Sequence, residues 1–181
     1  MALTATIYSF DVDLADNDRG VYESLAIRLA QHPSESDEYL VARLIAYLVE
    51  YAEGITVSRG VSEPEEPAIS VRDLTGAITS WIDIGTPDTA RLHKASKAAP
   101  RVAVYCHKDP TQWLRQLDTS SIHRGDALEL YAIDRGLIAG LISRLDRRMA
   151  FAVSINDREL LVSIGDDNLQ GQIVRSGQHQ Q

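Results

Sequence analysis

The residues with the clearest chemical potential lie at positions 81–88, which read Trp-Ile-Asp-Ile-Gly-Thr-Pro-Asp. The apolar alternation predicts a strand that turns directly into a helix, with Thr86 as the cap of that helix. Asp83 then lies at the rim of a sheet, on the strand face of Trp81 and opposite Ile82. A carboxylate at such a rim is paired with a base, exposed to water or bound to a metal.

A run of basic side chains follows on the helix predicted over residues 87–99. Arg91 and Lys94 stand three positions apart and share one helix face, and Lys97 and Arg101 extend the run along the chain. Two interpretations are open. The run forms a rim that contacts the phosphates of a nucleic acid, or it is a solvated helix face, which is the commoner reason for such spacing.

A long helix is predicted upstream of this strand, over residues 34–53. Ser34 and Asp37 resemble a capping box with Asp in place of Glu or Gln, and apolar residues at helical spacing follow. Glu38 falls at the edge of this apolar stripe, in line with Val41. Its carboxylate is therefore expected to overlook the sheet, or else to complement the helix dipole as an ordinary first-turn acid.

Alternating and helical patterns order the rest of the chain. Strands are predicted over residues 5–14, 55–59, 68–74, 77–84, 101–107, 128–133, 150–155, 159–164 and 169–175. Helices are predicted over residues 20–31, 34–53, 87–99, 110–117 and 135–146. The predicted fold is mixed α/β: an N-terminal strand and helix, a central mixed sheet flanked by helices, and a C-terminal extension rich in strands.

Size and composition indicate one ordinary globular domain. The chain has 181 residues, of which 44% are hydrophobic and 24% charged, so we expect a single domain over residues 1–176 and a flexible tail over residues 177–181. The net charge of -8 opposes non-specific binding to nucleic acid or anionic membranes. Any contact with nucleic acid must therefore use a local basic patch.

Cysteine usage and the chain start predict a cytoplasmic protein with no membrane association. The single Cys106 cannot form an intrachain disulfide, and it ends an apolar run, which favours a buried inert thiol. Residues 1–5 lack the basic and apolar regions of a secretion signal. No apolar run approaches the roughly 20 residues that cross a bilayer as a helix.

The predicted order helix, three strands, helix, strand, over about residues 34–107, resembles the core of the restriction-endonuclease-like PD-(D/E)xK nuclease superfamily. More specifically, the chain resembles the YaeQ family over nearly its whole length. The segments that carry this resemblance are residues 1–8, 32–35, 59–60, 66–67 and 81–88. The YaeQ family is regarded as a variant of the nuclease fold with a poorly defined biochemical role, so the resemblance implies architecture more than activity.

The superfamily resemblance implies a set of ligands for one or two divalent ions, usually Mg²⁺, with Mn²⁺ as a substitute. Carried over by position, Glu38 corresponds to the acid of the first core helix, Glu66 to the acid at the second strand and Asp83 to the acid of the third. Glu35 and Asp73 are reserve candidates. Carboxylates are hard oxygen ligands that suit Mg²⁺, and the ion both neutralises phosphodiester charge and supplies a bound water as nucleophile.

The chain departs from the superfamily pattern two residues after the last acid, where a lysine is expected and Gly85 stands. Gly85 shares the sheet face of Asp83, so the space beside it is open to a long side chain from the next helix. The resemblance implies that Arg91 or Lys94 replaces the missing lysine. Arg91 can orient a phosphate but cannot act as a base, because its pKa is above about 12, whereas Lys94 can do either. A tight turn is the other reason for glycine here.

Two functions remain open at this point. The first is a Mg²⁺-dependent nuclease or related phosphodiesterase, with Glu38, Glu66 and Asp83 as metal ligands and Arg91 or Lys94 as the auxiliary cation. The alternative is a non-catalytic regulatory or protein-interaction module on the same scaffold, in which Asp83 only forms an ion pair. Converging carboxylates favour the enzyme, whereas scattered carboxylates with basic partners favour the binding module.

Overall fold

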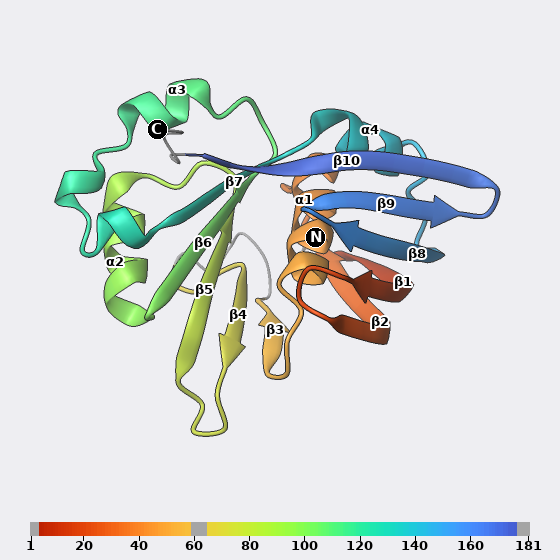
Figure 1. The fold of residues 1–181 in the computed structure, drawn as a ribbon, viewed down its shortest axis with the longest axis horizontal. Coiled ribbons are helices and arrows are strands. Elements are labelled where there is room, and N and C mark those ends of the chain that lie inside the picture. The colour runs from red at the N-terminus through yellow and green to blue at the C-terminus, as the bar shows by residue number, and fades with distance from the viewer. Residues whose placement is uncertain (1–3, 59–64, 177–181) are drawn as a thin grey trace.

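The computed structural model describes residues 4–58 and 65–176, so the predicted tail over residues 177–181 and the segment at residues 59–60 lie outside the described residues. The described residues form ten strands in one mixed sheet, in the order β2-β1-β8-β9-β10-β7-β6-β5-β4-β3 (Figure 1). The strands are β1 (Thr6–Asp16), β2 (Val21–Gln31), β3 (Ile55–Val57), β4 (Ile69–Arg72), β5 (Ile78–Ile84), β6 (Arg101–Cys106), β7 (Glu129–Ile133), β8 (Arg148–Asn156), β9 (Glu159–Ile164) and β10 (Asp167–Ser176). The helices are α1 (Asp37–Val49), α2 (Thr89–Ala98), α3 (Thr111–Gln116) and α4 (Arg135–Ile142), with short 3₁₀ turns η1 (Thr119–Ser121) and η2 (Gly125–Ala127).

Strand β10 joins the two halves of this sheet. Its first part, from Asp167 to Gln172, pairs antiparallel with β9, and its last part, from Ile173 to Ser176, pairs antiparallel with β7. Figure 1 shows the two halves splayed on either side of this strand, with α1 between them. The result is a mixed α/β fold in which a large, nearly closed sheet curves around one long helix.

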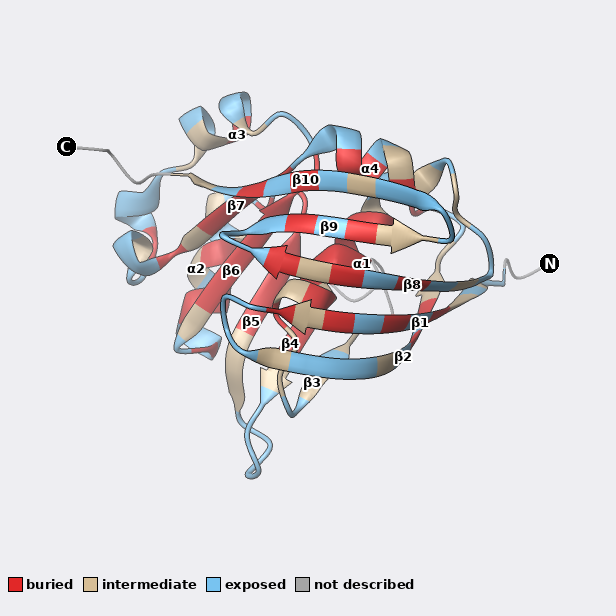
Figure 2. Cartoon of the chain, turned by 45° about the vertical axis from the view of Figure 1, so that its right-hand side comes forward, coloured by how far each residue is buried: buried red, intermediate tan, exposed pale blue. Residues whose placement is uncertain are grey.

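Two apolar cores lie on opposite faces of the strands β5 and β6. On the concave face, Leu40 of α1 packs in one cluster with Ile82 of β5, and α4 contributes to the same core. On the other face, Trp81 packs with Leu92 of α2. Figure 2 shows α1 as buried and the strands around it as alternately buried and exposed. Each fully buried Leu or Ile stabilises the fold by about 1.5–3 kcal/mol, so α1 is held mainly by this burial.

Strand β2 corrects the prediction of a helix over residues 20–31. Leu25, Ile27 and Leu29 satisfy helical spacing in part, but in the structure they alternate with exposed residues, and β2 pairs antiparallel with β1 along its length. Strand β1 in turn pairs in parallel with β8. The N-terminal unit is therefore a hairpin and not a strand and helix, because pairing with β1, which is itself held by β8, decided a short pattern that fits both periods.

The predicted order helix, three strands, helix, strand is present as α1, β3, β4, β5, α2 and β6. The helix starts differ from the prediction. The Oγ of Ser36, and not Ser34, accepts the amide of Tyr39 at the start of α1, and Asp88, not Thr86, caps α2. None of the helices in the described part of the chain has the length and apolar character that a membrane crossing needs.

Candidate functional site

Asp83 lies near the end of β5 and is only 2% exposed. Arg91 of α2 binds both of its carboxylate oxygens: Nε donates to Oδ2 at 2.7 Å and Nη2 donates to Oδ1 at 3.0 Å. The indole nitrogen of Trp81 also donates to Oδ1, at 3.0 Å. The hydrogen bond to Asp83 raises the pKa of Arg91. The buried carboxylate is therefore bound by a fork-shaped cation and by a neutral donor, which is the arrangement that stabilises a buried charge.

Local sequence places Arg91 opposite Asp83. Gly85 has a φ of +96°, so it takes a left-handed conformation that lets the chain turn directly after β5. The carboxylate of Asp88 then accepts the amide of Arg91 at 2.8 Å, which starts α2 at the point where Arg91 reaches back to the strand. The interpretation of Gly85 as a turn residue is confirmed, and a Cβ at this position would lie 3.7 Å from Cε1 of His107.

Glu66 and Lys94 lie near this pair but do not join it through their side chains. The backbone oxygen of Glu66 accepts Nη2 of Arg91 at 2.9 Å, while the Glu66 side chain belongs to an exposed residue. Lys94 forms an ion pair with Glu65, and the two side chains are 53% and 73% exposed. Lys94 is thus directed to the loop before β4, and the cation that contacts Asp83 is Arg91.

Glu38 faces a separate hollow. Helix α1 packs on the face of β5 that carries Ile82, whereas Asp83 and Trp81 lie on the opposite face, under α2. Glu38 is exposed and lines a hollow together with His107 and Arg135. The charge of Glu38 acts on His107, whereas the α1 side chain that feels the charges of Asp83 and Arg91 is that of the neighbouring Tyr39.

His107, which also lines this hollow, is buried at 8% exposure. Burial lowers its pKa, the charge of Lys108 lowers it further, and Glu38 opposes both effects. Its Nδ1 atom is buried and has no hydrogen-bond partner among the described residues. His107 is therefore held neutral near pH 7.

The two reserve acids have structural contacts of their own. Glu35 is buried at 8% exposure and pairs with Arg43, whose Nη2 lies 3.3 Å from Oε2 of Glu35 and 2.8 Å from the oxygen of Ala30. Asp73 lies in the turn between β4 and β5, where its carboxylate accepts the amide of Thr75 at 2.8 Å. Asp73 is a turn residue, and Glu35 is one half of a buried ion pair.

The arrangement of these carboxylates does not fit a shared divalent ion. In the two described ranges, no group of three or more His, Cys, Asp and Glu side chains is placed to hold one metal. A Mg²⁺ ion needs oxygen lone pairs at about 2.1 Å in near-octahedral geometry. Asp83 directs its oxygens to Arg91 and Trp81, and Glu38 faces another hollow. The set Glu38, Glu66 and Asp83 stays a prediction that would need these contacts to change.

The predicted basic patch is not continuous in the structure. Arg91 is paired with Asp83 and Lys94 with Glu65. Lys97 is exposed on α2, but Arg101 begins β6 and takes part in a different cluster of charges. Neutralised and dispersed cations attract a phosphate backbone less than a free row does.

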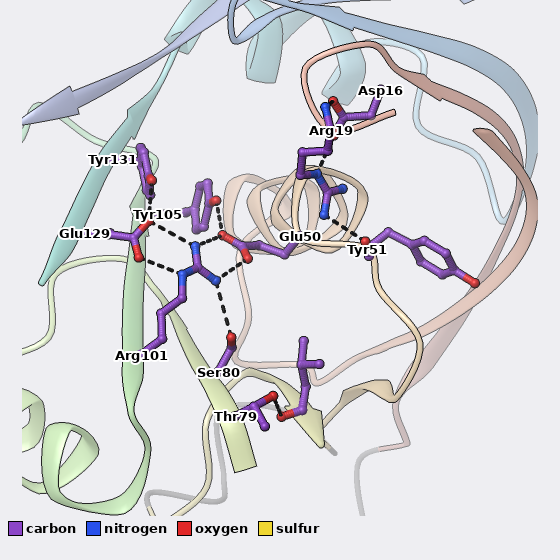
Figure 3. A network of polar contacts seen from close by, with 11 residues as sticks. Asp16, Arg19, Glu50, Tyr51, Thr79, Ser80, Arg101, Tyr105, Glu129 and Tyr131 are labelled. Atoms are coloured by element: carbon purple, nitrogen blue, oxygen red, sulfur yellow. Dashed lines mark hydrogen bonds and ion pairs between the residues drawn. The ribbon is translucent and has the colours of Figure 1, made fainter. Parts of the chain in front are cut away.

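A cluster of charges around Arg101 was not predicted from the sequence. Figure 3 shows Arg101 between Glu50 and Glu129. Arg101 donates from Nη1 to Glu50 at 2.6 Å and from Nε to Glu129 at 2.6 Å. The hydroxyl of Tyr105 donates to Glu50, and that of Tyr131 donates to Glu129 at 2.7 Å. The available signal was that Glu50, Arg101 and Glu129 each lie at an end of a helix or strand, but which of them meet depends on the sheet.

The ionisation of this cluster follows from its contacts. Burial opposes the charge of Arg101, but its hydrogen bonds to Glu50 and Glu129 raise its pKa overall. Burial raises the pKa of Glu129, but the hydrogen bonds from Arg101 and Tyr131 lower this pKa by more than burial raises it. The pKa of Glu129 is therefore below its usual value. Burial and the neighbouring carboxylates raise the pKa of Tyr105 and of Tyr131. Near pH 7 these shifts keep Glu129 and Arg101 charged and the two phenols neutral.

The fold defines the class of this protein as mixed α/β, with one large, nearly closed mixed sheet and few helices. Within that class the chain belongs to the YaeQ family, because the family model described as "YaeQ protein" matches residues 1–173. The family resemblance inferred from the residues is confirmed.

Relatives and solved structures agree over nearly the full length. "Uncharacterized protein YaeQ" of Salmonella typhi is 33% identical over 176 residues, which cover 96% of this chain and 97% of that protein. The protein of the same name in Escherichia coli (strain K12) is 31% identical over 94% of both chains. The crystal structure of YaeQ protein from Pseudomonas syringae superposes with a TM-score of 0.89 at 28% identity, and covers 97% of both chains. The structure of YaeQ protein from Xanthomonas axonopodis pv. citri gives a TM-score of 0.87 at 30% identity, covering 96% of this chain and 98% of that one.

Proposed function

We propose that this protein is a non-catalytic binding module, with a regulatory or protein-interaction role, on a scaffold that resembles the restriction-endonuclease-like core. The observation that carries the proposal is the closure of the Asp83 carboxylate by Arg91 and Trp81. A carboxylate that coordinates an ion or activates a water must direct free lone pairs at it. The oxygens of Asp83 instead accept hydrogen bonds from Arg91 and Trp81.

The charge distribution supports the same proposal. The chain carries a net charge of -8, and two cations of the predicted patch, Arg91 and Lys94, already have acidic partners. Non-specific affinity for nucleic acid depends on the number of free cations that neutralise phosphates. A protein or small-molecule partner therefore suits this surface better than a nucleic acid.

The competing proposal is a Mg²⁺-dependent nuclease with Glu38, Glu66 and Asp83 as ligands. The order α1, β3, β4, β5, α2 and β6 supports it, since this order resembles the superfamily core. It requires Arg91 to leave Asp83, which would strand a carboxylate that is 2% exposed. It also requires Glu38, which lines a hollow with His107 and Arg135, to turn toward Asp83.

The deciding experiment combines metal titration with cleavage assays on the full chain. Mg²⁺ and Mn²⁺ are titrated calorimetrically into wild type, and plasmid, single-stranded DNA and RNA are incubated with each metal and with wild type, Asp83→Asn or Lys94→Ala. Arg28→Ala, an exposed substitution on β2, is the matched control for loss of one positive charge. We expect no stoichiometric binding of either metal and no cleavage that depends on Asp83.

Cleavage by wild type that is lost in Asp83→Asn and retained in Arg28→Ala would overturn the proposal in favour of the nuclease. Cleavage that is equal in wild type and Asp83→Asn comes from a contaminant and leaves the binding proposal standing.

A further inference from the structure

A cavity of about 340 Å³ opens where β6 and β7 begin. Its wall comes from six parts of the chain: the β1–β2 turn, the end of α1, strand β6, strand β7, the β8–β9 turn and β10. Its lining includes apolar side chains such as Val49, Ile155 and Ile173 beside the charged groups. Small-molecule sites have volumes of about 300–1,000 Å³, with apolar walls and a few fixed polar groups. This cavity has that character, and none of Asp83, Arg91 and Glu38 lines it.

The floor of the cavity carries the carboxylates of Glu50 and Glu129. The guanidinium of Arg101 lies between them and already donates all of its N–H groups. Arg101 donates from Nε to Glu129, from Nη1 to Glu50 and to Ser80 at 3.4 Å, and from Nη2 to both glutamates (Figure 3). An arginine has five N–H donors, so Arg101 has none left for a ligand. Two carboxylates face one cation, and the Oε2 atoms of Glu50 and Glu129 each accept a single hydrogen bond from the described residues. The floor therefore offers acceptor capacity at these two oxygens, and Arg175 is a further cation whose charge acts on Glu129.

The mouth of the cavity has the opposite character. Arg158 lies with its guanidinium carbon 5.0 Å from the ring centre of Tyr131, and its side chain makes no hydrogen bond or ion pair to any residue in the described ranges. Arg19 donates from Nε to Asp16 at 2.7 Å and from Nη1 to the oxygen of Tyr51 at 2.8 Å. Its Nη2 donates to none of the described residues. Two guanidinium groups at the mouth thus have donors available.

The backbone holds Arg158 at the mouth in a conformation that a side chain disfavours. Asp157 and Arg158 form the two-residue loop between β8 and β9, with φ angles of 49° and 60°. Such a loop favours glycine at the second position. The carboxylate of Asp18 accepts the amides of Asp157 at 2.7 Å and of Arg158 at 2.9 Å, which locks the turn against the β1–β2 loop. Glycine would adopt this φ with less strain than arginine. The presence of arginine here therefore indicates that its side chain has a function.

We propose that this cavity binds a small zwitterionic molecule. Its anionic end, a phosphate or a carboxylate, pairs with Arg158 and Arg19 at the mouth, and its ammonium end faces Glu50 and Glu129 on the floor. The apolar wall contacts the short carbon chain between the two ends. This site is separate from Asp83, so the proposal stands or falls independently of the metal and cleavage assays.

The test uses matched probes with the full chain, measured by calorimetry. O-Phosphoethanolamine and 4-aminobutyrate are the phosphate and carboxylate zwitterions, and the tighter of the two identifies the anionic group. Inorganic phosphate lacks the ammonium end, and ethanolamine lacks the anionic end. We expect at least one zwitterion to bind at least about tenfold more tightly than either half-probe, which corresponds to about 1.4 kcal/mol.

Arg158→Gly separates binding from folding, because glycine tolerates the positive φ at this position. We expect at least about tenfold weaker zwitterion binding with a melting temperature close to that of wild type. Arg28→Ala, which removes an exposed arginine on β2 outside the cavity, should bind as wild type does.

Three results would overturn the proposal. The first is no binding of either zwitterion at millimolar concentration. The second is unchanged affinity in Arg158→Gly. The third is a marked loss of melting temperature in Arg158→Gly, which would assign Arg158 a purely structural role.

Discussion

The two charge clusters of this protein use the same chemistry with opposite balance. Near the end of β5, the Asp83 carboxylate accepts three hydrogen bonds, two from the guanidinium of Arg91 and one from the indole of Trp81. In the cavity, the guanidinium of Arg101 is shared by two carboxylates, Glu50 and Glu129. The two clusters therefore differ in the number of acids for each guanidinium, one against two, and only the second cluster lines the cavity. The ratio of acids to cations and the space beside them, rather than the presence of charged residues, decide where a ligand can be held.

The two clusters also differ in what they connect. Asp83 and Arg91 lie eight residues apart, within one strand–turn–helix unit. Arg101 connects to Glu50 and Glu129, which lie 51 and 28 residues away. The pair of Asp83 and Arg91 stabilises the turn from β5 into α2. The cluster around Arg101 instead connects the end of α1 to the starts of β6 and β7.

The largest expected effect is the loss of Arg101. Arg101→Met leaves two carboxylates in the cavity without their cation, and we expect a loss of about 3 kcal/mol in the free energy of unfolding. Urea denaturation measures it, and Arg101→Lys, which keeps the charge but loses the fork, should lose less. A loss below about 1 kcal/mol in Arg101→Met would show that the cluster contributes little to folding, and would break the comparison.

Arg91→Ala should have the second-largest effect, about 2 kcal/mol by the same measurement, because Asp83 keeps the indole donor of Trp81 but loses its counter-charge. Asp83→Asn, which removes the charge that needs the partner, is the control and should lose less. We also expect Arg91→Ala to bind Mn²⁺ no better than wild type, since Glu38 faces another hollow. A gain of stoichiometric Mn²⁺ binding would show that the rim holds a latent metal site.

The pH dependence of stability should separate His107, in the hollow of Glu38, from the cavity cluster. Burial lowers the pKa of His107 from 6.5, so the unfolded chain takes up the proton first and stability falls as the pH drops below about 6.5. The pKa of Glu129 is lowered from 4.5, so its contribution is present above that value and is lost as the pH falls further. A single titrating group changes the free energy of unfolding by at most about 1.4 kcal/mol per pH unit.

Denaturation midpoints between pH 3 and 8 check this order. His107→Gln should flatten the profile just below pH 6.5, and Glu129→Gln should flatten it only below pH 4.5. A His107→Gln profile that matches wild type around pH 6 would contradict the assignment of a buried neutral histidine.

The smallest expected effect is at the exposed ion pair of Lys94 and Glu65. Both side chains are more than half exposed, so Lys94→Ala should change the free energy of unfolding by no more than about 0.5 kcal/mol. Added salt should remove most of that difference. A larger, salt-resistant loss would mean that Lys94 takes part in the rim and would weaken its contrast with Arg91.

Much of the region around Asp83 was predictable from the sequence, because the residues that form it lie close together along the chain. The opposite faces of Trp81 and Ile82, the turn at Gly85 and the burial of Cys106 all follow from periodicity and backbone preference, and the structure confirms them. The exact helix cap was not predictable, since several neighbouring residues in each loop are good caps and the final register of the helix selects one.

The non-local features escaped prediction for a different reason. Residues 20–31 have a pattern that fits helix or strand, and only pairing with β1 assigns them to the sheet. The cluster of Glu50, Arg101 and Glu129 carries no sequence signal of its partners, because polar residues at the ends of elements are common and usually solvated.

The sequence by itself determined the mixed α/β class and the family, which rest on motifs and patterns along the whole chain, and the local unit that brings Arg91 to Asp83, which rests on residues close along it. Only the tertiary structure decided that Glu38 faces the hollow of His107 while Arg91 binds Asp83, and that a cavity forms between segments from six parts of the chain. The physical reason is that strand pairing and core burial select among distant partners by their total free energy, which no local pattern contains.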